Sequence, residues 1–174
     1  MSEIILQSNR LLFRKITPDD FDELAVMLTN PKVMYAWEHT FSPEQITEWI
    51  DRQLQYYETD GVGYFAAITK ADGAFVGQMG LHRSTLSGKQ ILEVCYILKE
   101  QYFGKGYALE GARALVNYAH TQMREPEVYA EIRTNNLPSL QVAERLRMTR
   151  TGSFIKHYNG IDMEHQIYVS SAHV

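Results

Sequence analysis

Two glycines one residue apart stand just before an amphipathic stretch, in the segment QYFGKGYALEGARALVNYAH at 101–120. The first N–H groups of a helix lack intrahelical partners and lie at the positive end of the helix dipole, so they can bind a phosphate. Glycine there permits a positive φ and removes a side chain that would block a diphosphate. Gly104 and Gly106 therefore predict either a turn leading into a helix or an anion site at its start.

Spacing excludes two familiar nucleotide loops. A Walker loop needs a lysine followed by serine or threonine, whereas Lys105 is followed by Gly106. The dinucleotide fingerprint GxGxxG needs a third glycine where Leu109 stands. Neither loop is present, and the two glycines need another explanation.

Other residues able to do chemistry lie on a predicted strand and at a predicted helix start. In ILEVCYIL, alternation places Glu93, Cys95 and Ile97 on one face. Cys95 is the only cysteine, so the chain forms no internal disulfide and no cysteine-based zinc site, and a reducing cytoplasm is expected. We interpret it as a packed strand residue. The histidines show no metal-ligand spacing, and we assign no metal.

Composition and charge exclude several classes of function. The chain has 174 residues, a formal charge of −4, 45% hydrophobic and 22% charged residues. These values are typical of one globular domain, which we place at 1–174 with a core at about 8–169. No basic stripe supports nucleic-acid binding, and neither a signal peptide nor a membrane span is recognisable.

Periodicity and turn signals predict an α+β fold. The front third reads as a strand at 10–16, a helix after Thr17-Pro18 and a second helix opened by a capping box at Ser42–Gln45. The middle of the chain predicts three strands, at 63–69, 75–83 and 91–98, with a polar loop before the last of them. A helix at 107–121, a strand at 128–133 and a helix at 136–147 are expected next. Two final strands, at about 148–157 and 161–169, are expected to be joined by a type I′ turn at Asn159-Gly160. This order predicts a mixed, mostly antiparallel central sheet flanked by helices.

The pattern Gln101-x-x-Gly104-x-Gly106 resembles the acyl-CoA pyrophosphate motif of the GCN5-related N-acetyltransferases (GNAT). Its context looks like the branch that acetylates ribosomal-protein N-termini at alanine. SNRLLFRKITPDD, FVGQMGLH, EVCYIL and NNLPSLQVAERLRM match that branch in order, so the resemblance covers about 8–168. It implies the GNAT fold, with a splayed fourth strand at 91–98 and acetyl-CoA as co-substrate.

The resemblance also implies residues that hold acetyl-CoA. The pantetheine arm would pair with the strand backbone, and the diphosphate would meet the glycine loop. Asn136 would bond the pantetheine, and Ser139 would lie near the thioester sulfur, although both residues also fit a helix cap. The full implied set is Tyr96, Ile97, Leu98, Phe103, Gly104, Lys105, Gly106, Tyr107, Ala108, Asn136 and Ser139.

For the chemistry, the resemblance implies direct attack of an amine on the thioester. Glu93 is the favoured base, with Glu131 and His82 as weaker choices. Relatives often carry a tyrosine acid where this chain has Ala143, so Ser139 or a water is the candidate acid. A second departure is Arg147, which stands at the usual helix-ending glycine and must adopt a left-handed backbone or shift the end of the helix.

The acceptor is expected between 33–41, the loop 84–90 and the last hairpin. Tyr35, Trp37, Glu38 and His39 could line this pocket, together with His82. A protein or peptide N-terminal amine and a small amine are both open as acceptors. The competing hypothesis is a non-catalytic acyl-CoA sensor, favoured by Ala143 and the unassigned base. Oligomeric state is also open, with a homodimer the commonest symmetric assembly.

Overall fold

The structure is a computed structural model that describes residues 2–173. In this range eight strands form one sheet in the order β1-β2-β3-β4-β5-β6-β8-β7, antiparallel except for the β5–β6 pair. The strands are β1 (Ile4–Gln7), β2 (Leu11–Lys15), β3 (Tyr64–Thr69), β4 (Phe75–Leu86), β5 (Lys89–Leu98), β6 (Glu127–Arg133), β7 (Thr149–Tyr158) and β8 (Ile161–Ser171). The predicted mixed, mostly antiparallel sheet is confirmed.

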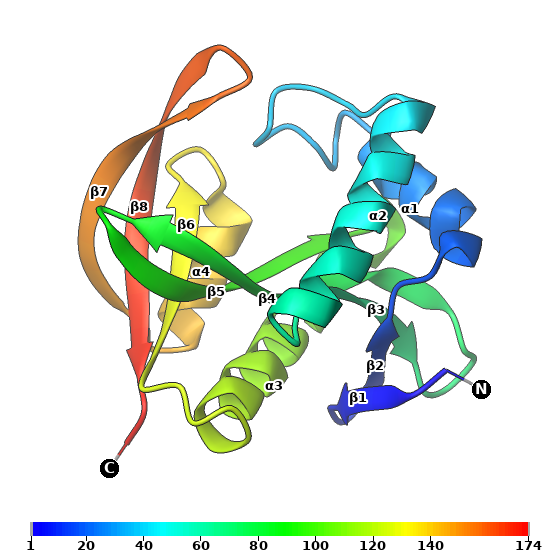
Figure 1. The fold of residues 1–174 in the computed structure, drawn as a ribbon, viewed down its shortest axis with the longest axis horizontal. Helices are drawn as coiled ribbons and strands as arrows, with labels where there is room; N and C mark the ends of the chain where they lie inside the picture. The colour runs from blue at the N-terminus through cyan, green and yellow to red at the C-terminus, as the bar shows by residue number, and fades with distance from the viewer. Residues whose placement is uncertain (1, 174) are drawn as a thin grey trace.

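Helices cover both faces of the sheet. The α-helices are α1 (Phe21–Leu28), α2 (Pro43–Thr59), α3 (Tyr107–Thr121) and α4 (Leu137–Arg145), with 3₁₀ turns η1 (Pro18–Asp20) and η2 (Glu100–Tyr102). Figure 1 shows α1 and α2 with β1–β3 on one side of the molecule, and β6, β8 and β7 on the other. One buried cluster lies under α1 and α2, and a larger one lies between the sheet and α3.

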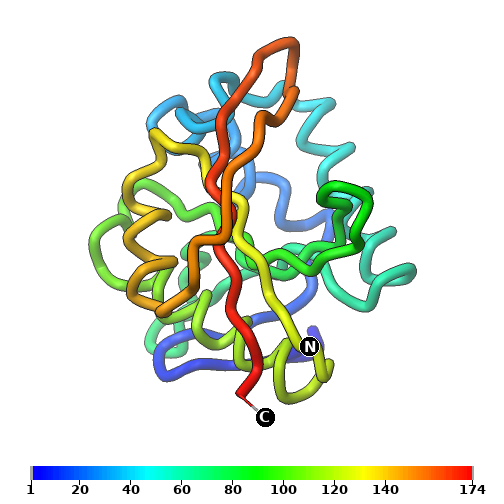
Figure 2. Tube along the Cα trace, turned by 90° about the vertical axis from the view of Figure 1, so that its left-hand side faces the viewer, coloured from blue at the N-terminus to red at the C-terminus, as the bar shows by residue number. Residues whose placement is uncertain are grey.

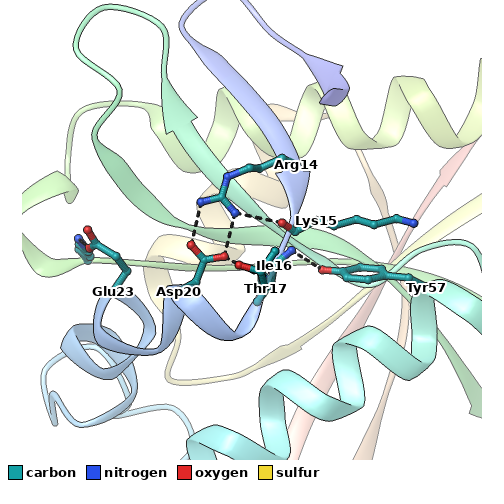
Figure 3. A network of polar contacts seen from close by, with 8 residues as sticks. Arg14, Lys15, Ile16, Thr17, Asp20, Glu23 and Tyr57 are labelled. Carbon is teal, nitrogen blue, oxygen red and sulfur yellow. Dashed lines mark hydrogen bonds and ion pairs between the residues drawn. The ribbon is translucent and has the colours of Figure 1, made fainter. Parts of the chain in front are cut away.

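The end of β2 is fixed to the helices that follow it (Figure 3). The Arg14 guanidinium donates two hydrogen bonds to the Asp20 carboxylate, at 2.8 and 2.7 Å. The same carboxylate accepts from Thr17 N at 2.9 Å. The Ile16 N–H donates to the Tyr57 hydroxyl of α2 at 3.0 Å. These bonds tie the end of β2 to the start of α1 and to α2.

Local capping signals set the predicted helix starts. In the capping box of α2, Ser42 N donates to Gln45 Oε1 at 2.8 Å and Gln45 N donates to Ser42 Oγ at 3.2 Å. Asn136 caps α4, its Oδ1 accepting from Ser139 N at 3.4 Å. α4 ends with Arg147 in a left-handed conformation, φ 57°. Arginine therefore occupies the position that glycine usually fills.

One strand prediction was wrong, and one strand was not predicted. The segment 84–90 is not a polar loop, because β4 and β5 continue to a two-residue turn at Ser87-Gly88, where φ is 49° and 81°. Positive φ at both positions matches the twist of a tight hairpin, so the polar residues stay in the strands. β1 was not predicted, because its four residues give too short a periodic signal; it pairs with β2.

The last hairpin was correctly predicted. Asn159 and Gly160 both have positive φ, 51° and 75°, as a type I′ turn requires. Figure 2 shows this β7–β8 hairpin running the length of the molecule, its tip near the α1–α2 loop. No helix within residues 2–173 is long and apolar enough to cross a membrane.

Candidate active site

The neighbouring strands β5 and β6 separate in the middle of the sheet. β5 pairs with β4 along its whole length, from Leu86↔Lys89 to Gly77↔Leu98. Within residues 2–173 one pair joins β5 to β6, Glu93↔Tyr129. Beyond it the two parallel strands diverge, so the β6-facing edge of β5 at 94–98 borders an opening between β5 and β6, which we call the wedge. The predicted splayed strand is confirmed, and its edge offers backbone groups to an extended ligand.

The glycine loop follows directly from this edge. Gly104 and Gly106 have φ of 70° and 81°, values that side chains rarely tolerate. Gly106 is the N-cap of α3, and its carbonyl accepts the first intrahelical bond, from Glu110 N at 3.1 Å. The preceding helix N–H groups at 107–109 are therefore available to an anion. The Phe103 amide is committed elsewhere, because it donates to Glu100 O at 3.0 Å.

A clamp from the turn between β1 and β2 supports this loop, and sequence reasoning missed it. Arg10 Nε pairs with Glu110 Oε2 at 2.6 Å, and Arg10 Nη1 donates to Lys105 O at 3.1 Å. The guanidinium lies 4.2 Å from the centre of the Tyr107 ring. Ser8 Oγ also donates to Glu110 Oε1, at 2.6 Å. These contacts fix the loop before any ligand arrives, which reduces the ordering cost of binding.

Asn136, Ser139 and Tyr96 meet on the far side of the wedge. Besides capping α4, Asn136 Oδ1 accepts from the Tyr35 hydroxyl at 2.9 Å. Tyr96 and Ser139 both line the cavity at this end, and burial raises the pKa of Tyr96 to about 12. The phenol of Tyr96 is therefore neutral near pH 7 and is a proton donor.

Two carboxylates lie where β5 and β6 still pair. Glu93 Oε2 accepts from Ser84 Oγ at 2.6 Å. Glu131 has a side chain only 6% exposed, 3.7 Å from Lys156 Nζ. Burial, together with the neighbouring Glu93 charge, raises the pKa of Glu131 to about 7. A buried carboxyl with a raised pKa beside a second carboxylate is typical of proton-transfer sites.

His82 faces Glu93 from the neighbouring strand. The two residues are register partners on β4 and β5. The pKa of His82 is lowered, chiefly by burial, so its imidazole is neutral at pH 7. On the same face of β5, burial raises the pKa of the Cys95 thiol. Cys95 therefore remains a thiol and not a nucleophilic thiolate.

These groups border one cavity of about 600 Å³. Its floor is the sheet face carrying the carboxylates, and its walls come from α2, the α1–α2 loop and the β7–β8 hairpin. The cavity also extends to the wedge between β5 and β6. Among the residues expected from sequence, those that line it are Trp37, His39, His82, Glu93, Tyr96, Ile97, Glu131, Asn136 and Ser139.

Sequence comparison places the chain in a family. A family model described as an acetyltransferase (GNAT) domain matches residues 10–149. The chain belongs to the GNAT acetyltransferase family. An uncharacterised protein of Bacillus subtilis, YkkB, is 28% identical over 144 residues, which cover 82% of this chain and 84% of that protein.

Solved structures show the same fold. A GNAT-family acetyltransferase from Bacillus anthracis superposes with a TM-score of 0.82 at 24% identity, covering 95% of this chain and 97% of that one. RimL, a ribosomal L7/L12 α-N-protein acetyltransferase solved in complex with coenzyme A, gives 0.81 at 17% identity, covering 98% of each chain. The predicted GNAT fold is confirmed.

Other expected GNAT site residues lie outside this cavity. Leu98 and the loop residues 103–108 lie along the wedge and its exit, at the β5–α3 junction. The Tyr35 hydroxyl donates a hydrogen bond to Asn136 Oδ1, and the Glu38 carboxylate pairs with Arg133 Nη2 at 3.0 Å. The segment 84–90, now part of the β4–β5 hairpin, does not contribute to the lining.

Proposed function

We propose that this GNAT chain transfers an acetyl group from acetyl-CoA to a primary amine by direct attack. One observation carries the proposal: the β5–β6 wedge, the cap of α4 and the Glu93 carboxylate open into the same cavity. Acyl transfer to nitrogen needs a bound thioester, a base for the amine and a proton for the departing sulfur. Each of the three has a candidate here.

Acetyl-CoA would supply an activated acetyl thioester. The backbone of 96–98 would pair with the pantetheine amides along the open edge of β5. The amides of Gly104, Gly106, Tyr107 and Ala108 would hold the diphosphate, with Lys105 adding a charge. The positive φ of both glycines supports this fit, since it aims consecutive N–H groups outward at the start of α3.

Glu93 would accept the proton of the attacking amine. Ser84 already donates to one of its oxygens at 2.6 Å, which fixes the carboxylate at the cavity floor. In the reaction the nitrogen lone pair forms the new C–N bond, the C–S bond breaks, and one amine proton passes to Glu93. A positioned base of this kind contributes on the order of 10²–10⁴-fold in rate.

Ser139 would protonate the departing sulfur, with Tyr96 behind it. Ala143 is buried and carries no hydroxyl, so α4 offers no tyrosine at that position. Ser139 lies beside the Tyr96 phenol, an arrangement that would let the serine give its proton to sulfur and regain one from the phenol. Tyr96→Phe should lower kcat more than it weakens acetyl-CoA binding.

The test is thiol release from acetyl-CoA across a panel of primary amines, with mass detection of the acetylated product. The proposal expects turnover with at least one amine, and a loss of at least about tenfold in kcat for Glu93→Gln. Binding of acetyl-CoA without any acetylated product would instead identify a non-catalytic acyl-CoA sensor. Glu58→Gln, an exposed carboxylate of α2, is the matched control.

A further inference from the structure

One wall of the cavity is an unbroken series of rings. His39 stacks on Phe41 at 5.3 Å, Phe41 meets Trp49 at 5.8 Å, and Trp49 meets Tyr64 at 5.1 Å. Tyr158, from the β7–β8 hairpin, closes the series at its outer end, its hydroxyl 2.8 Å from His39 Nε2. We call these five residues the aromatic wall; all line the cavity.

The rings of the aromatic wall are only half covered by protein. Phe41, Trp49 and Tyr64 pack against the core under α1 and α2 on one side and line the cavity on the other. The indole N–H of Trp49 donates to Gln78 Oε1 at 2.8 Å, so the polar atom of this ring is already paired. What remains toward the cavity is apolar ring surface, the kind that small-molecule sites present to a ligand.

The inner end of the aromatic wall reaches the proposed reaction centre. Tyr64 lines the cavity together with Cys95, which lies two residues along β5 from Glu93 and on the same face. Tyr56 adds a ring beside His82, 5.0 Å away, and His82 is the register partner of Glu93. An amine whose nitrogen lies at Glu93 would therefore place its substituent against Tyr64 and Trp49.

Most of the cationic side chains around the cavity already contact a carboxylate. Arg133 pairs with Glu38 at 3.0 Å and donates to Ala36 O at 3.0 Å. Lys156 lies 3.7 Å from Glu131. Arg52 lines the mouth and is exposed to solvent. A second ammonium on the acceptor would meet Arg52, Arg133 and Lys156 as well as the carboxylates Glu48 and Glu131, whereas a flat apolar group would meet matching ring surface.

We propose that the acceptor is a primary amine with an aromatic ring two or three bonds from its nitrogen, seated on the aromatic wall. This inference rests on the acetyl transfer proposed above. Offset or edge-to-face contact with Trp49 and Phe41 would orient the ring and hold the nitrogen near Glu93. A free small amine and the N-terminal amine of a peptide can both carry such a ring, and the experiment below distinguishes between them.

The experiment compares kcat/KM for phenethylamine and phenylalaninamide with that for butane-1,4-diamine and glycinamide. We expect at least about a tenfold preference for the aromatic amines, a factor that corresponds to about 1.4 kcal/mol. A higher value for phenethylamine would point to a free small amine, and a higher value for phenylalaninamide to a peptide end; both support the proposal. Equal or better use of the diamine and glycinamide would overturn it and leave acetyl transfer standing.

Variants of the aromatic wall complete the test. Phe41→Leu and Trp49→Leu should abolish most of the preference while leaving the Kd for acetyl-CoA unchanged. Phe21→Leu is the matched control, since Phe21 packs in the same core but does not line the cavity. Phe41→Leu keeps the experiment decisive if Trp49→Leu fails to fold. An unchanged preference in a folded Phe41→Leu protein would contradict the proposal, and absence of turnover with every amine would contradict the proposed transfer itself.

Discussion

At the scale of single residues, the backbone conformation of Gly104 makes a direct prediction. A side chain at φ 70° costs about 1–2 kcal/mol, and nothing within 4 Å of its Cβ position would otherwise resist it. Gly104→Val should therefore turn the loop amides and weaken acetyl-CoA binding at least about tenfold, measured by calorimetry. Gly73→Val is the matched control, with the same φ and open space in the β3–β4 turn. Equal affinities in the two variants would contradict the diphosphate assignment.

The raised pKa of Glu131 predicts how the free energy of unfolding changes with pH. Its pKa rises from 4.5 to about 7 on folding, because it is buried beside Glu93. Between these values the native state holds a proton that the unfolded state has released. The free energy of unfolding should therefore fall as the pH rises through this window.

Glu131→Gln removes that titration. Denaturant unfolding at several pH values should show a shallower decline between pH 4.5 and 7 in the variant. Glu58→Gln, on the exposed face of α2, removes the same charge without the buried site. A decline as steep in Glu131→Gln as in the unchanged chain would show that another group is responsible.

Among elements, α4 has an unusual end. Met148 N donates to Ala143 O and Arg147 N to Glu144 O, so the bonds of a helix-ending motif form around an arginine at φ 57°. Arg147→Gly should raise the free energy of unfolding by about 1 kcal/mol, because glycine adopts this conformation without strain. Arg145→Gly, at the last residue of the helix, should instead lower it, by up to about 1 kcal/mol. Thermal unfolding of the two variants measures both effects, and destabilisation by Arg147→Gly would refute the strain argument.

The helices and strands also show which features of the fold can be predicted from the sequence. The capping box of α2, the glycines before α3 and the periodic apolar faces of both helices are local, so their starts were predicted correctly. The continuation of β4 and β5 was missed because Ser84, Thr85 and Gln90 are polar, although the Ser87-Gly88 turn fixes the register. Contacts between distant segments, such as Arg10 with Glu110, arise only when the chain is folded. The clamp behind the glycine loop and the aromatic wall could not be predicted for that reason.

At the scale of the whole molecule, two groups of strands meet at one point, the Glu93↔Tyr129 pair. A ligand lying in the wedge would bridge them. Saturating acetyl-CoA, at 100 times its Kd, should stabilise the fold by about 2.7 kcal/mol. Hydrogen exchange should slow at 94–98, at 104–108 and in the first turn of α4. Protection confined to the β7–β8 hairpin, or absent from the wedge, would place the cofactor elsewhere.

The central claim is that an amine attacks the acetyl thioester directly inside this cavity. A single-turnover reaction with excess protein over acetyl-CoA, quenched in time and analysed by intact mass, tests it most directly. The account predicts acetylated amine appearing as the thioester disappears, while the protein keeps its original mass throughout. A protein species heavier by one acetyl group that forms and decays at the turnover rate would contradict direct attack, as would thioester loss without any acetylated amine.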